Sequence, residues 1–148
     1  MFSQLFGKYL VDNKVITKEQ LDEVISKMEN VRAKLGFIAV SEGILTKEKA
    51  EEINILQTQK DAKFGDIAVE EGYITKEQLE DMLDKQGSTY IKFMQVLEEV
   101  SGLLQNEIET HIEEFRKNIG FAPEELEALK NDDIDKIVEV PSSRMKSL

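Results

Sequence analysis

The side chains best suited to binding in this chain are a lysine and a glutamine that occur twice, each time with a glycine close to the lysine. The two sets have the same internal spacing: Lys34, Gly36 and Gln57, then Lys63, Gly65 and Gln86. An ammonium group and a carboxamide can bind a polar or anionic ligand, and a glycine lets that ligand approach the backbone. A structural explanation also fits, because glycine permits close helix packing, lysine suits a surface and glutamine is tolerated at a helix end.

The sequence offers little else for catalysis. His111 is the one histidine, and its place on an apolar helix face is more typical of a packed or half-exposed residue than of a general base. Cysteine is absent, which excludes thiol catalysis, disulfides and zinc–thiolate sites. The acidic cluster at 132–135 lacks the glycine and the distal glutamate of a calcium loop. We therefore predict a protein that is not an enzyme and that binds neither a metal nor a cofactor.

Charge and hydropathy limit the class of partner. The 148-residue chain has a net charge of −11 and no basic stripe, so we do not expect it to bind a nucleic acid polymer. A small anionic ligand remains compatible with this charge, because backbone N–H groups and one or two lysines act locally. No apolar run is long enough for a membrane span and no signal peptide is recognisable, so we expect no membrane insertion and a cytoplasmic location.

The spacing of the two lysine–glutamine sets is part of a 29-residue repeat. Glycines and threonines recur at this interval: Gly43 is followed by Gly72, and Thr46 by Thr75. The fourth copy keeps the apolar pattern but has Met94 where the second and third copies have their first glycine. We predict four copies, at 5–28, 34–57, 63–86 and 92–115.

Each copy has the pattern of a helical hairpin. In the third, apolar residues fall at helical spacing on a short first helix: Phe64, Ile67 and Ala68. Gly72 is suited to end that helix, and Thr75 with Gln78 is a capping-box pattern that starts a longer one. Asp61, and Ser3 at the same place in the first copy, are predicted N-caps of the short helices. We therefore predict an all-α protein made of tandem helical hairpins with a C-terminal helical extension.

The predicted hairpins form one repeat domain over 1–120. The chain from 121 to 148 then has a different pattern, with Pro123 and two glutamates suited to a first helical turn. The segment DDIDKIVEV fits either a short helix or a strand, and the last residues fit a flexible tail.

The two central copies resemble the MshEN domain, the N-terminal domain of type II secretion and type IV pilus assembly ATPases. That family carries two tandem 24-residue motifs separated by five residues. Each motif runs from Arg-Leu-Gly through a second glycine and two leucines to a final glutamine. The stretches 34–57 and 63–86, with the gap 58–62, match this length and spacing.

The resemblance implies a cyclic di-GMP site in which each motif holds half of the dinucleotide. The matching positions are Lys34, Leu35, Gly36, Gln57, Lys63, Phe64, Gly65, Leu79, Leu83 and Gln86. By similarity, the lysines lie against guanine and the backbone of the next two residues approaches the phosphates. The glutamines bond the ligand, and the leucines of the second motif supply apolar contact.

The chain departs from the family pattern at the residues with the strongest expected contacts. Both family arginines are lysines here, and lysine lacks the planar guanidinium that stacks on a base and donates two parallel hydrogen bonds. The leucine positions of the first motif hold Ala50 and Asn54. We therefore expect a non-enzymatic bacterial signalling or protein-interaction module with an unidentified protein partner. The alternative is a cyclic di-GMP receptor that tolerates lysine.

Overall fold

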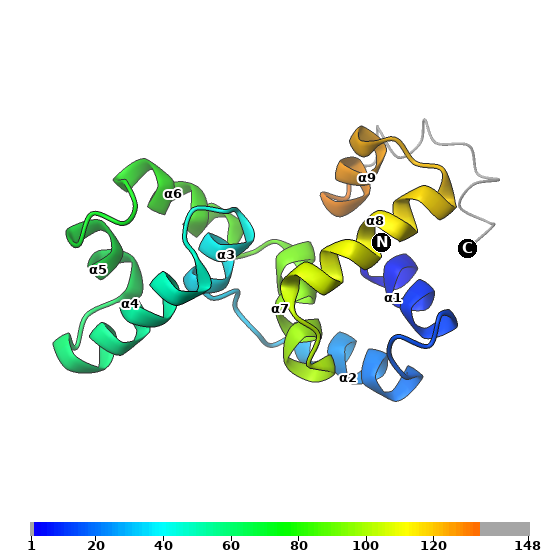
Figure 1. Ribbon diagram of the computed structural model, residues 1–148, viewed down its shortest axis with the longest axis horizontal. Coiled ribbons are helices and arrows are strands. Elements are labelled where there is room, and N and C mark those ends of the chain that lie inside the picture. The colour runs from blue at the N-terminus through cyan, green and yellow to red at the C-terminus, as the bar shows by residue number, and fades with distance from the viewer. Residues whose placement is uncertain (1, 134–148) are drawn as a thin grey trace. The chain divides into compact units, whose positions relative to one another are not determined.

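The computed structural model describes residues 2–133, and all regular structure in that range is α-helical (Figure 1). The helices are α1 (Phe2–Asp12), α2 (Lys18–Met28), α3 (Leu35–Ser41), α4 (Lys47–Lys60), α5 (Phe64–Glu70), α6 (Lys76–Lys85), α7 (Thr89–Ser101), α8 (Gln105–Ile119) and α9 (Pro123–Lys130). The predicted all-α class is confirmed. The predicted flexible tail, and most of the segment that fitted either a helix or a strand, lie outside the described residues.

The chain divides into two compact units. The central unit is the continuous stretch 32–92, with α3, α4, α5 and α6, and the outer unit combines 2–31 with 93–133 of the described chain. This differs from the single domain expected over 1–120, because the first and fourth copies belong to one unit and the second and third to the other. It also places α9, expected to follow the domain, in the outer unit.

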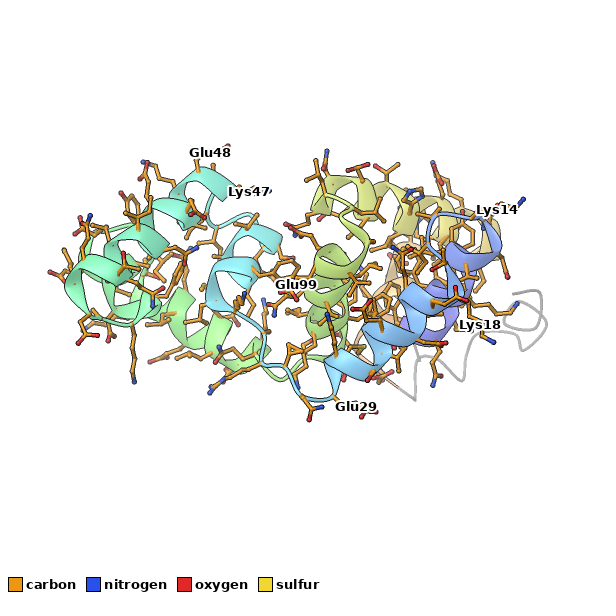
Figure 2. The ribbon with its side chains drawn as sticks, turned by 90° about the horizontal axis from the view of Figure 1, so that it is seen from below. Lys14, Lys18, Glu29, Lys47, Glu48 and Glu99 are labelled. Carbon is orange, nitrogen blue, oxygen red and sulfur yellow. The ribbon has the colours of Figure 1, made fainter. Side chains whose placement is uncertain are left out.

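Local signals position the helices of the central unit. The side chain of Thr75 accepts a hydrogen bond from Gln78 N at 3.1 Å and the Gln78 side chain accepts one from Thr75 N at 2.9 Å, so the predicted capping box is present. Thr46 caps α4 only through Lys49 N, because a lysine side chain has no acceptor to complete the box. The side chains of Lys47 and Glu48 lie on the outside of the central unit, in the first turn of α4 (Figure 2).

Two predicted N-caps are wrong. Asp61 instead ends α4 in the left-handed conformation, with φ of 49°, and Lys63 is the residue before α5. The reason is that α4 continues to Lys60 and uses the intervening residues for its own C-terminus. Ser3 is buried inside α1, which begins at Phe2.

The core of the central unit forms where each hairpin packs against the other. Helix α4 contacts α5, and α3 contacts α6. Six apolar side chains there are fully buried: Ile38, Ala39, Ile53, Ile67, Ala68 and Met82. Burying them accounts for the pairing, because one hairpin alone leaves its apolar stripe in water.

The core of the outer unit is aromatic. Phe6 of α1 lies 5.5 Å from Phe115 of α8 and 6.4 Å from Phe93 of α7, between ring centroids. Helix α8 buries Ile112 and leaves His111 half-exposed, 3.5 Å from Glu114. His111 therefore lies at the margin of the buried apolar face of α8 and is not one of the residues buried in it.

Candidate functional site

All ten predicted site residues lie in the central unit, although they differ in exposure. Lys34 and Lys63 are exposed and directly precede α3 and α5. Gln57 on α4 and Gln86 at the end of α6 are half-buried. The remaining six are Leu35, Gly36, Phe64, Gly65, Leu79 and Leu83, and of these Leu83 is the most exposed, at 44%.

The first turns of α3 and α5 pack against each other at the two glycines. A Cβ atom on Gly36 would lie 3.2 Å from the ring of Phe64, and one on Gly65 would lie 3.5 Å from Leu35 Cδ1. The residue after each lysine therefore covers the glycine of the other motif. Leu79 also covers Gly65, with Cδ1 2.6 Å from where that Cβ would be. These contacts give both glycines a packing role, since a side chain at either place would disturb its neighbour.

The two glutamines make equivalent hydrogen bonds. Gln57 Nε2 donates to the carbonyl of Ala62 at 3.4 Å, and Gln86 Nε2 donates to the carbonyl of Ala33 at 3.0 Å. Ala62 and Ala33 directly precede the two motif lysines. Each glutamine therefore holds the backbone at the start of the other motif, which gives the repeated glutamine a role in folding.

Arg32 also belongs to the site, because it contacts a motif glutamine, although the repeated motifs do not include it. Its Nη2 donates to Gln86 Oε1 at 2.8 Å. We call the bonds among Arg32, Ala33 and Gln86 the Gln86 junction. The repeat does not predict this arginine, because the equivalent position before the other motif holds Asp61. The opposite charges at these two equivalent positions are the one sequence feature that sets Arg32 apart.

Only one of the two motif starts has an apolar surface beside it. Leu35 and Leu79 are partly buried and converge on Gly65, and Leu83 lies one turn further along α6, before Gln86. We call Leu35, Leu79 and Leu83 the apolar edge. At the equivalent places on α4, Ala50 is 7% exposed and Asn54 is exposed and polar. The two halves therefore differ in chemistry.

Two ion pairs connect the hairpins. Lys60 lies 3.0 Å from Glu71 and Lys85 lies 3.2 Å from Glu42, so each long helix bonds the glutamate after the other hairpin's short helix. The hydrogen bond to Glu71 raises the pKa of Lys60. Partial burial lowers the pKa of Lys85, but hydrogen bonds to Asp81 and Glu42 outweigh it and the net shift is upward. Both ammonium groups therefore stay charged over the neutral range.

The described chain has neither a metal-site geometry nor a membrane helix. Within residues 2–133, no group of three or more histidine and acidic side chains is placed to hold a metal ion. Among the described helices, none combines the length and apolar content that a membrane span requires.

Comparison with known proteins adds no relative. No protein-family model matches the chain, and neither a curated protein nor a solved structure matches it. The relation to the MshEN domain therefore depends on the two motifs and stays a prediction. What the geometry defines is an all-α protein whose central pair of hairpins is held together by the two motif glycines and the two motif glutamines.

Proposed function

We propose that this chain is a non-enzymatic protein-interaction module of bacterial signalling, with an MshEN-like helical fold and a cytoplasmic location. Its partner is an unidentified protein that binds the apolar edge. The observation that carries the proposal is Leu83, which stays 44% exposed one turn of α6 beyond the partly buried Leu79. A single exposed leucine is ordinary, but this one follows a partly buried leucine on the same helix and lies three residues before Gln86, which Arg32 contacts, and apolar positions rimmed by polar groups are typical of binding sites.

The use of the motif glutamines also supports this proposal. The amide donors of Gln57 and Gln86 bond backbone carbonyls of the same unit. The repeat therefore has a structural purpose without any nucleotide, because these bonds and the glycine contacts hold the hairpins together.

Site-specific photo-crosslinking in the source cells tests this function. A benzophenone amino acid at Leu83 should give a protein adduct, and one at Ile55 should not. Ile55 is a matched control because it is an apolar residue, 52% exposed, on α4, a helix that carries none of the three residues of the apolar edge. Adducts at both positions, or at neither, would contradict the proposal.

A substitution at Leu83, with the crosslinker moved to a neighbouring residue, makes the same test specific for the apolar edge. With the crosslinker at the exposed neighbour Glu80, Leu83→Asp should reduce the adduct about tenfold, since loss of a buried anchor commonly costs that much affinity. An unchanged yield would mean that Leu83 is not part of the interface.

A cyclic di-GMP receptor is the second candidate function, and Arg32 is the observation that favours it. The motifs lack the family arginines, but Arg32 supplies a guanidinium at the Gln86 junction, two residues before Lys34. A guanidinium can stack on a base or pair with a phosphate as lysine cannot.

Isothermal titration with cyclic di-GMP at low salt tests the second candidate. Micromolar binding should weaken about tenfold in Arg32→Ala, the usual cost of a charge-assisted bond. It should be lost in Gln57→Ala/Gln86→Ala. Binding that appears only in Lys34→Arg/Lys63→Arg would show that the natural chain has lost the activity. Absence of heat at millimolar ligand would eliminate this candidate.

A further inference from the structure

The chain passes between its two units twice, and the Gln86 junction lies beside both passages. The first passage is at Val31–Arg32 and the second at Lys92–Phe93, within the first turns of α7. Arg32 and Ala33 follow the first passage directly, and Gln86 precedes the second by a few residues. The junction therefore closes the two ends of the central unit across 53 and 54 residues of sequence.

The stability of the outer unit depends on how close together the two ends of the central unit are held. It is assembled from an N-terminal segment and a C-terminal segment, which meet in the aromatic contacts of Phe6 with Phe93 and Phe115. While the junction is closed, these segments leave the central unit from neighbouring points. When it is open, they are joined by a longer and freer connection, and the entropy cost of bringing them together increases.

We propose that opening of the outer unit is coupled to opening of the Gln86 junction. The junction is then a conformational device through which events in the central unit change the stability of the outer unit. A closed junction lowers the entropy cost of bringing the two outer segments together, and by linkage a folded outer unit favours the closed junction. The inference does not depend on which partner or ligand the central unit binds.

The chain contains its own control for this inference. Gln57 makes the same type of bond at the equivalent place of the first motif, to Ala62. That bond joins two consecutive hairpins inside the central unit and lies beside neither passage. Removing it weakens the central unit without releasing its ends.

Amide hydrogen exchange of the full chain tests the coupling. In Gln86→Ala, which loses the bonds to both Ala33 and Arg32, exchange of the Ile38 amide, which donates to Lys34, should increase at least about fivefold, the effect of losing one neutral hydrogen bond. Exchange of α1 and α8 in the outer unit should also increase, by a smaller factor set by the longer connection. In Gln57→Ala the increase should be confined to α4 and α5.

Two further variants keep the test decisive. If Gln86→Ala is too unstable to study, Gln86→Met keeps the side-chain length and its apolar part but removes both bonds, and increases in the same places are expected. Arg32→Ala should give the same pattern with a smaller amplitude. Unchanged exchange of α1 and α8 in the Gln86 variants, or an equal increase in Gln57→Ala, would overturn the proposal.

Discussion

Lys14 has a backbone conformation that glycine adopts at the same place in the two central hairpins. Its φ is 60°, and Gly43 and Gly72 have φ of 73° and 78°. The turn is the same in each case, because the amide at this place donates to the carbonyl three residues earlier, at 3.0 Å for Lys14, 3.1 Å for Gly43 and 3.0 Å for Gly72. Substituting glycine for Lys14 therefore preserves the turn and removes a side chain that disfavours it.

The expected gain can be worked out from two opposing effects. The left-handed conformation costs a residue with a Cβ about 1–2 kcal/mol, which Lys14→Gly recovers. Glycine makes the unfolded chain more flexible, which returns about 0.4–1 kcal/mol. We expect Lys14→Gly to stabilise the outer unit by about 0.5–1 kcal/mol, raising its unfolding midpoint by about 3–6 °C.

The reverse substitution is the matched control. A Cβ on Gly72 would have no atom within 4 Å, so Gly72→Ala tests the conformation without a clash. It should destabilise the central unit by about 1 kcal/mol. The assay is differential scanning calorimetry, with hydrogen exchange to assign each change to α1 or α5. A lower midpoint for Lys14→Gly, or an unchanged one for Gly72→Ala, would refute the reasoning.

Three other outcomes are expected. Gly65→Ala should destabilise the central unit by up to about 2 kcal/mol, because its Cβ would lie 2.6 Å from Leu79 Cδ1 and displacing that side chain outweighs the roughly 1 kcal/mol that alanine gains in a helix, and a double-mutant cycle by urea denaturation should show most of this loss relieved in Leu79→Ala. Phe6→Ala should cost the outer unit about 3–5 kcal/mol, since Phe6 is fully buried, and hydrogen exchange should detect the loss in α8. A lysine whose pKa is raised by folding stabilises fully below its unfolded pKa, and this contribution is lost as the pH rises through the folded pKa. The denaturation midpoint should therefore be lower above pH 10.5, the ordinary pKa of lysine, than at pH 9. Lys85→Met should reduce this fall, and an equal fall in that variant would contradict the prediction.

The candidate site was only partly predictable from the sequence. The motif residues do lie in one unit, and Leu35, Gly36, Phe64 and Gly65 do meet, as equal spacing in two packed hairpins suggests. Arg32 could not be found by that route, because it is not repeated. Its contact with Gln86 depends on the return of the chain after two hairpins, which no local pattern records.

The sequence by itself determined the helices and most of their ends. Capping boxes at Thr17 and Thr75 and left-handed glycines at Gly43 and Gly72 depend on bonds between residues three to five apart, so their partners are already present in the local sequence. The prediction failed at Asp61 because a good capping residue there ends α4 instead of starting α5, and local preference does not distinguish the two.

The tertiary structure decided which hairpins pair. All four copies present a similar apolar stripe, so periodicity cannot select a partner for any of them. Packing joins the second copy with the third, and the first with the fourth, where Phe6 meets Phe93 and Phe115. The Gln86 junction and the exposed Leu83 follow from that choice, because each depends on surfaces that come together only when distant parts of the chain have been buried against one another.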